Sequence, residues 1–168
     1  MKKFMLVLSV ITLNACNNTA KNEKAIENHY PETERATIRA ENRNEEVITI
    51  NGDDDMKFDK TELKAKEGQT VKLMLKHVGK APVGAMGHNV VILAQGTDFN
   101  AFANAAIDAK DNDYIPKRME NAVIAKTNII GGGQITEITF IAPAKGSYDF
   151  LCSFPGHCIY MKGKFIVA

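Results

Sequence analysis

Several features that would point to a common class of protein are missing from this sequence. It has no apolar run long enough to cross a bilayer, no internal repeat and no glycine-rich loop of the phosphate-binding type. Its charge is almost balanced, with 21 Lys and Arg residues against 20 Asp and Glu residues. The sequence therefore gives no indication of a membrane-spanning helix, a phosphate-binding nucleotide site or a nucleic-acid partner.

Residues 1–15 are predicted to be a secretory signal peptide. A short basic start is followed by an apolar run over 4–13. The run ends in Leu-Asn-Ala-Cys, which resembles a bacterial lipobox, where cleavage precedes a cysteine that becomes lipidated. We therefore expect lipid on Cys16 to tether an exported protein to a membrane, and Asn17 favours the outer membrane, facing the periplasm or the cell surface. The alternative is an ordinary signal peptide followed by a chance cysteine.

Residues 16–46 are predicted to be the lipidated cysteine and a flexible linker. The segment has few large apolar residues and many Asn, Glu, Lys and Arg residues. Such a composition buries too little apolar surface to offset the entropy of ordering the chain. A short amphipathic helix over 32–43 is the alternative. His29 lies in this segment, and we expect it to be solvated rather than a ligand.

Residues 47–168 read as a domain of short strands. In 70–77 Val71, Leu73, Leu75 and His77 alternate with polar or long side chains, as in a half-buried strand. Further strands are expected at 89–93, 135–141, 147–152 and 163–168, with turn residues between them. This pattern predicts an all-β sandwich or barrel. Residues 98–110 are the exception: their alanine-rich composition and helical spacing predict a short helical insert with Asp98 as N-cap.

Three soft or borderline metal ligands lie close together near the C-terminus, in the pattern Cys152-x4-His157-x3-Met161. Alternation along 147–152 places Cys152 on the face of Phe150, so we expect its side chain to point inward. Pro155 and Gly156 then allow a turn that brings His157 back toward it. Three ligands are too few to enclose a metal, so another must come from elsewhere in the chain.

The best source of that ligand is the stretch Met86-Gly87-His88-Asn89, directly before an apolar strand. His88 would bind through a ring nitrogen, and glycine at 87 would let its carbonyl approach a metal. Each residue alone is more often a packing residue than a ligand. Together, two histidines, a cysteine and a distant methionine are the ligand set of blue-copper electron-transfer sites.

Residues 47–168 resemble the azurins of the cupredoxin family over essentially their whole length. The matching stretches are "INGDDDMKFDKTEL", "LKHVGKAPVGAMGHNVVIL", "DYIPKRMENAVIAKTNIIGGG" and "CSFPGHCIYMKG". The resemblance implies an eight-stranded Greek-key β-sandwich with one mononuclear type 1 copper. It implies His88, Cys152 and His157 as close ligands, with Met161 and the Gly87 carbonyl as distant axial ligands.

The resemblance also assigns supporting positions and shows departures. Asn89 and Ser153 match residues that tie the two ligand loops together, with backbone amides there bonding the cysteine sulfur, and His77 matches a buried histidine beside the site. The disulfide that azurins usually carry is absent, because Ile48 and Gly68 fall near its positions. Val90 stands where azurins often have tryptophan. Cys158 is an additional cysteine, and as the neighbour of His157 it is a poor candidate for a second thiolate ligand.

The function expected from these residues is one-electron transfer between redox partners, without enzymatic activity, because no position is left open for a substrate. The resemblance implies docking of redox proteins such as c-type cytochromes through an apolar patch, formed by Met86, Pro155, Gly156 and Ile159. The alternative is a copper carrier or store that delivers the metal itself. A copper nitrite reductase would need a second cupredoxin domain, for which this chain is too short.

Overall fold

The computed structural model describes residues 44–168, together with Pro31 and Thr33. Residues 44–168 fall within one compact unit of the chain. The expected signal peptide, Cys16, His29 and nearly all of the expected linker, with its alternative helix, lie outside the described residues. The first strand begins at Glu45, slightly before the boundary expected at Val47.

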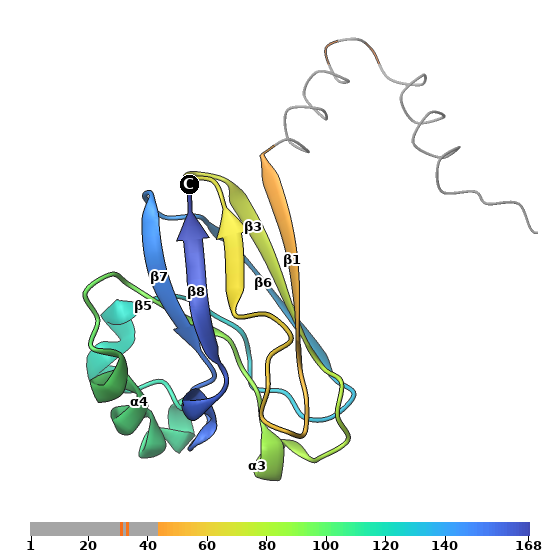
Figure 1. Ribbon diagram of the computed structural model, residues 1–168, viewed down its shortest axis with the longest axis vertical. Helices are drawn as coiled ribbons and strands as arrows, with labels where there is room; N and C mark the ends of the chain where they lie inside the picture. Colours follow the sequence, from red (N-terminus) through yellow and green to blue (C-terminus); the bar gives the residue numbers. More distant parts are fainter. Residues whose placement is uncertain (1–30, 32, 34–43) are drawn as a thin grey trace, which may run out of the picture. The chain divides into compact units, whose positions relative to one another are not determined.

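Within residues 44–168, eight strands form two sheets (Figure 1). The smaller sheet has the order β1-β3-β6 and comprises β1 (Glu45–Gly52), β3 (Thr70–His77) and β6 (Ile135–Ile141). The larger sheet has the order β2-β8-β7-β4-β5 and comprises β2 (Glu62–Ala65), β8 (Lys162–Val167), β7 (Gly146–Leu151), β4 (Val91–Leu93) and β5 (Val123–Lys126). The predicted all-β, eight-stranded fold is confirmed.

Alternation of side chains directs the core between the two sheets. In β3, Val71, Leu73, Leu75 and His77 are buried as predicted, and the intervening residues are partly exposed. Phe150 of β7 and Phe165 of β8 are fully buried in the same apolar cluster. Each such side chain contributes about 1.5–3 kcal/mol by leaving water. Both cysteines among the described residues are free, so this part of the chain is held by its core and hydrogen bonds.

The predicted helical insert is α4 (Phe99–Ile107). Asp98 caps it, because its Oδ1 accepts the backbone N–H of Ala101 at 2.9 Å. Phe102 packs against Val91 and Leu93 in a second apolar cluster, whereas Ile92, between them in β4, belongs to the main core. Since β4 is buried on both faces, its sequence is continuously apolar rather than alternating.

Three short helical elements outside α4 were not predicted from the sequence. They are the helix α3 (Val83–Met86) and the 3-10 helices η1 (Lys110–Asn112) and η2 (Lys117–Ala122). A further 3-10 helix, η3 (His157–Ile159), lies in the segment 152–161, called the ligand loop below because it holds Cys152, His157 and Met161. Within residues 44–168 no helix is both long and apolar enough to cross a bilayer.

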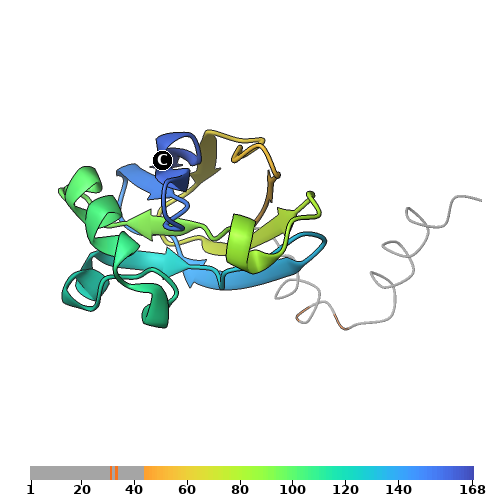
Figure 2. The same ribbon diagram turned by 90° about the horizontal axis from the view of Figure 1, so that it is seen from below.

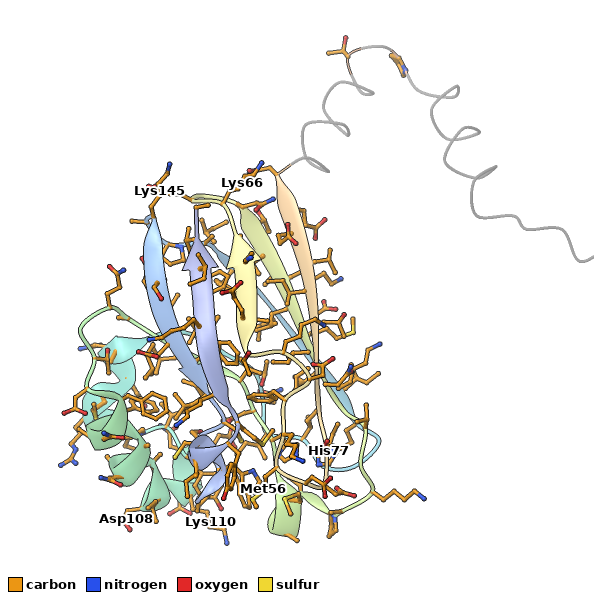
Figure 3. The ribbon with its side chains drawn as sticks, in the orientation of Figure 1. Met56, Lys66, His77, Asp108, Lys110 and Lys145 are labelled. Atoms are coloured by element: carbon orange, nitrogen blue, oxygen red, sulfur yellow. The ribbon has the colours of Figure 1, made fainter. Side chains whose placement is uncertain are left out.

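Strand directions bring the expected ligands to one end of the sandwich. β1 and β3 run parallel, with Gly52 opposite His77 at their final residues. β4 and β7 run antiparallel with Val91 opposite Leu151, so the residues before β4 and after β7 are neighbours. His88 precedes β4 and Cys152 follows β7. Figure 2 views the molecule from this end, where α3 lies in the foreground, and Figure 3 shows His77 there, with Lys66 and Lys145 at the opposite end.

Candidate metal centre

The structure brings His88, Cys152 and His157 into one buried cluster. Their ligand atoms lie within 4.8 Å of one another, and this is the one group of His, Cys, Asp or Glu side chains in the described part of the chain that could hold a metal ion. His88 and Cys152 are fully buried, and His157 is 3% exposed. The two halves of the ligand set expected from the sequence therefore meet.

Distances within the cluster suit one shared ion. The Nδ1 atoms of His88 and His157 are 3.2 Å apart, and His157 Nδ1 lies 3.7 Å from Cys152 Sγ. Bonds of a first-row metal such as zinc to imidazole nitrogen and thiolate sulfur are about 2.0–2.1 and 2.3 Å. Both separations are shorter than the sum of two such bonds, so these donor atoms lie close enough together to bind a single metal ion.

His88 is held in the tautomer that a ligand requires. Its Nε2–H donates to the Asp53 carbonyl at 2.8 Å, which leaves the Nδ1 lone pair facing the cluster. Burial lowers the pKa of His88, so the ring is neutral near pH 7. A backbone carbonyl therefore fixes both the orientation of this imidazole and its available nitrogen.

His77 supports His88 from behind. The two rings stack with centroids 4.2 Å apart and an interplanar angle of 9°. His77 Nε2–H donates to the Met86 carbonyl at 2.8 Å, and its Nδ1 accepts the N–H of Gly79 at 3.1 Å. With both nitrogens in use, His77 is a buried packing residue beside the site, as the resemblance implied.

His157 reaches the cluster through a tight turn. Gly156 has φ 82°, a left-handed conformation that glycine adopts without strain, and η3 begins at His157. The His157 ring packs against Phe154 with centroids 4.6 Å apart. Burial lowers the pKa of His157 to about 4, so this imidazole is also neutral near pH 7.

Burial raises the pKa of the Cys152 thiol to about 12, although backbone N–H groups of Asn89 and Phe154 bond the sulfur and oppose the rise. The metal-free thiol is therefore protonated near pH 7, and a bound cation must displace its proton. The resemblance placed amides of Asn89 and Ser153 at the sulfur. The Asn89 amide is there, but the second amide is that of Phe154, because the Ser153 N–H donates to Asn89 Oδ1 instead.

Met161 closes the ligand loop. Its carbonyl accepts the N–H of Cys152 at 2.9 Å, and its own N–H donates to the His157 carbonyl at 2.8 Å. These bonds fold the loop so that Cys152, His157 and Met161 share one region, and the Met161 side chain is fully buried.

Gly87 matters for its carbonyl group and because it has no side chain. Its oxygen lies 3.0 Å from His88 Nδ1 and 3.8 Å from Cys152 Sγ. A Cβ here would lie 2.7 Å from the Val83 carbonyl oxygen and 2.9 Å from the Phe154 ring. Only glycine fits between these groups, and the carbonyl is left facing the cluster.

Two residues of the site were not expected from the sequence. The Asp53 carbonyl orients His88, and Gly52 lies against both His88 and Met161. An Asn-Gly pair is typical of a turn, whereas Gly52 is the last residue of β1. A backbone carbonyl leaves no side-chain signal in a sequence. Cys158 lies outside the cluster and packs against the second apolar core under α4.

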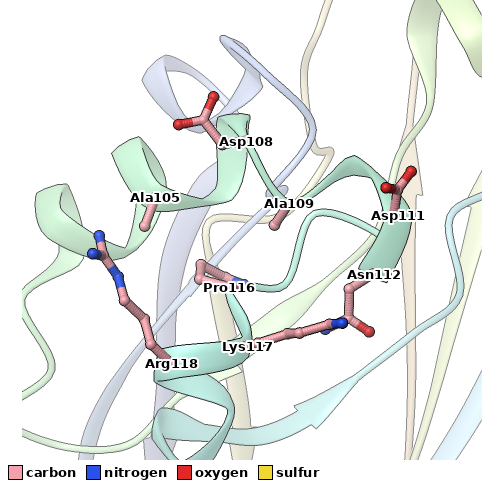
Figure 4. A pocket seen from close by; sticks show the side chains of 8 residues that line it. All are labelled: Ala105, Asp108, Ala109, Asp111, Asn112, Pro116, Lys117 and Arg118. Carbon is pink, nitrogen blue, oxygen red and sulfur yellow. The ribbon is translucent and has the colours of Figure 1, made fainter.

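A separate cavity of about 480 Å³ lies between α4, η1 and η2. In Figure 4 the side chains of Lys117 and Arg118, two of its lining residues, extend in opposite directions, and Pro116 is a third lining residue. Its remaining lining residues are Ala105, Asp108, Ala109, Asp111 and Asn112. It contains no His or Cys and shares no residue with the metal cluster.

The comparisons with known proteins give the cluster its chemical class. The model of the family "Copper binding proteins, plastocyanin/azurin family" matches residues 45–168. The chain belongs to this copper-binding family. Its cofactor is copper, and His88, Cys152 and His157 form the cluster able to hold one ion.

Individual members of the family are similar over the same region. Azurin of Alcaligenes faecalis is 41% identical over 121 residues, which cover 69% of this chain and 93% of that protein. Outer membrane protein H.8 of Neisseria gonorrhoeae is 38% identical over 122 residues, which cover 70% of this chain and 65% of that longer protein.

Solved cupredoxin structures share the fold. Auracyanin A, a blue copper protein of Chloroflexus aurantiacus, gives a TM-score of 0.64 at 34% identity, covering 74% of this chain and 99% of that one. Reduced auracyanin of Roseiflexus castenholzii gives a TM-score of 0.65 at 36% identity, covering 73% and 96%.

Proposed function

We propose that the protein carries single electrons on one type 1 copper, with His88, Cys152 and His157 as close ligands and Met161 and the Gly87 carbonyl as axial ligands. The observation that carries the proposal is the buried two-histidine, one-cysteine cluster, whose donor atoms are spaced for one ion. With an axial methionine this is the donor set of blue-copper sites. When bound there, copper supplies a one-electron couple between Cu(II) and Cu(I).

The residues around the cluster favour fast electron exchange. Asp53 holds His88 through its carbonyl, and Asn89 and Ser153 join the two ligand loops. Donors fixed in this way move little when the charge at the centre changes, so little reorganisation opposes electron transfer. The 0–3% exposure of the three side chains also leaves no path for a substrate, which supports a carrier rather than an enzyme.

The test is a titration of the metal-free protein with Cu(II), followed by visible absorption. We expect an intense thiolate-to-copper band that saturates at one ion per chain. Cys152→Ser should remove this band and leave weak, ordinary Cu(II) absorption, whereas Cys158→Ser should retain it. An intense band in Cys152→Ser would overturn the ligand assignment.

Delivery of copper to another protein is less well supported. A carrier needs ligands that a recipient can reach, and these ligands are buried and anchored at the ends of β4 and β7. Repeated oxidation and reduction should therefore leave copper in place in the presence of a chelator. Rapid loss of copper to the chelator would favour the carrier.

Electrons are proposed to pass through the apolar patch defined above. Of its members Ile159 is 60% exposed, Gly156 is exposed, and Met86 and Pro155 are partly buried. His157, the one close ligand with any exposure, lies within the same loop as three of them. A redox partner such as a c-type cytochrome would dock there and approach the edge of this imidazole.

We further propose that the protein is exported and anchored to the outer membrane through lipid on Cys16. The lipobox supports this, and the similar H.8 protein is named an outer membrane protein. β1 enters the domain at Glu45 and ends at Gly52 beside the cluster, a path of roughly 23 Å at strand geometry. The chain thus enters at the end of the domain remote from the metal centre. Cys16→Ser should move the exported protein from the membrane fraction to the soluble fraction, and unchanged fractionation would contradict the anchor.

A further inference from the structure

Gly52 occupies a position where a side chain would collide with two members of the copper site. A Cβ built on Gly52 would lie 2.8 Å from His88 Cδ2 and 3.2 Å from Met161 Cε. Carbon atoms in contact normally lie about 3.5–4.0 Å apart. The His88 ring edge and the Met161 methyl group therefore both approach the side-chain position that Gly52 leaves empty.

Backbone conformation does not explain the choice of glycine here. Gly52 is the final residue of β1 and is not among the glycines with positive φ. Its carbonyl accepts the N–H of Val78 at 2.8 Å, and it stands opposite His77 in the parallel register. An alanine could adopt this backbone, so the space beside the site is what requires glycine.

The neighbours of Gly52 could not all move to make room. His88 is bonded through Nε2 to the carbonyl of Asp53, the next residue in the chain, and its ring face is covered by His77. The Met161 methyl is the free end of a flexible side chain. A group added at 52 would therefore displace the Met161 thioether first and strain the His88–Asp53 hydrogen bond second.

We infer that Gly52 is a positioning residue that sets how closely the Met161 thioether and His88 approach each other, and so tunes the reduction potential of the centre. The inference rests on the proposed copper ligands. In blue-copper sites a weak axial ligand controls the potential, and the thioether sulfur is one bond from the methyl group that contacts Gly52. The strand end would then act on the potential without touching the metal.

The experiment compares Gly52→Ala with Gly84→Ala. Gly84 is a matched control, because a Cβ there meets nothing within 4 Å. We expect both variants to bind one copper per chain. Gly52→Ala should show a shifted midpoint potential and changed copper electron paramagnetic resonance parameters, and Gly84→Ala should match the wild type. Equal potentials and spectra in the two variants would overturn the inference.

A double-mutant cycle with Met161→Ala tests the contact itself. The potential shift caused by Gly52→Ala should be smaller when residue 161 is alanine. In the metal-free proteins, the loss of thermal stability in the double variant should be less than the sum of the two single losses. The second measurement works even if Gly52→Ala folds poorly. If the potential shifts and the stability losses of the two single variants simply add in the double variant, the inference is wrong. Absence of the intense visible band in the wild type would instead refute the proposed function.

Discussion

Three hydrogen bonds join Asn89 and Ser153 across 64 residues of sequence, the longest of them from the Ser153 hydroxyl to Asn89 Oδ1 at 3.3 Å. The Asn89 amide Nδ2–H donates to Ser153 Oγ at 2.8 Å, and the Ser153 backbone N–H donates to Asn89 Oδ1 at 2.8 Å. Asn89 follows the proposed ligand His88, and Ser153 follows the proposed ligand Cys152. The pair therefore fixes the spacing between the two segments that supply the cluster, and it is itself buried.

Alanine substitution of Asn89 and of Ser153 should lower the free energy of unfolding by different amounts. Asn89→Ala leaves both the Ser153 hydroxyl and its backbone N–H without their partner, and an unsatisfied buried group costs about 1–3 kcal/mol. Ser153→Ala keeps the bond from the backbone N–H to Asn89 Oδ1. We expect the free energy of unfolding of the metal-free protein, measured in urea, to fall more in Asn89→Ala than in Ser153→Ala. The reverse order would show that the hydroxyl, not the amide, carries the link.

Met161 should tune the centre more than it retains the metal. A long axial thioether contributes little binding energy, and its loss favours Cu(I). Met161→Leu, which keeps the side chain apolar and similar in volume, should therefore retain the intense visible band and raise the midpoint potential measured by redox titration. Copper affinity should stay within about tenfold, or ~1.4 kcal/mol, of the wild type. Loss of copper would mean that Met161 is a primary ligand.

Copper uptake at pH 7 should release about one proton per ion, because a coordinating thiol must be deprotonated. The pKa of Cys152 is raised to about 12 by burial, so its proton is present before binding. The pKa of His157 is lowered to about 4 by burial, so this ring is already neutral at pH 7 and can bind through its lone pair without releasing a proton. As pH falls toward 4, His157 becomes protonated in the metal-free protein, and the number of protons released should rise.

Calorimetry of Cu(II) binding in buffers with different ionisation enthalpies measures this number. Cys152→Ser is the control. Because the serine hydroxyl stays protonated, this variant should release fewer protons per bound ion at pH 7 than the wild type. Release near zero in the wild type at pH 7 would show that the thiolate already exists without the metal.

Side-chain patterns predicted those parts of the fold that depend on local alternation and spacing. The buried face of β3 and the Asp98 cap of α4 follow directly from the order of apolar and polar residues. The inward direction of Cys152 follows from its alternation with Phe150, and both are buried. These predictions succeed because burial of apolar surface decides which face of a strand or helix turns inward.

Backbone relationships could not be read in the same way. The parallel register that sets Gly52 opposite His77 joins segments distant in sequence and carries no local signal. The Asp53 carbonyl that orients His88 belongs to a group present in every residue. The closeness of His88 and Met161 to Gly52 likewise follows from the tertiary fold and from no local pattern in the sequence. The types of the proposed ligands and the side chains of Asn89, Ser153 and His77 around them were thus predictable, whereas the Asp53 carbonyl and the bare backbone of Gly52 were not.

The apolar patch should govern the rate of electron exchange without affecting the copper spectrum. Met86 is partly buried at the end of α3, and its carbonyl, which bonds His77, would remain in any side-chain variant. Met86→Lys places a charge in the proposed contact surface. In exchange between two copies of the protein, the two lysines would face each other across an otherwise apolar contact and repel.

Val47→Lys is the matched control for this substitution. Val47 is an apolar residue, 59% exposed, near the beginning of β1 at the end of the domain remote from the cluster. We expect Met86→Lys to slow self-exchange by about tenfold or more, equivalent to ~1.4 kcal/mol in the encounter, and Val47→Lys to leave it unchanged. In self-exchange the donor and the acceptor are the same protein, so the driving force is zero for every variant. A change in the midpoint potential therefore does not affect the comparison of rates. Stopped-flow measurements with a c-type cytochrome should give the same order. If Met86→Lys keeps the wild-type spectrum and exchanges as fast as Val47→Lys, electrons leave the protein by another surface.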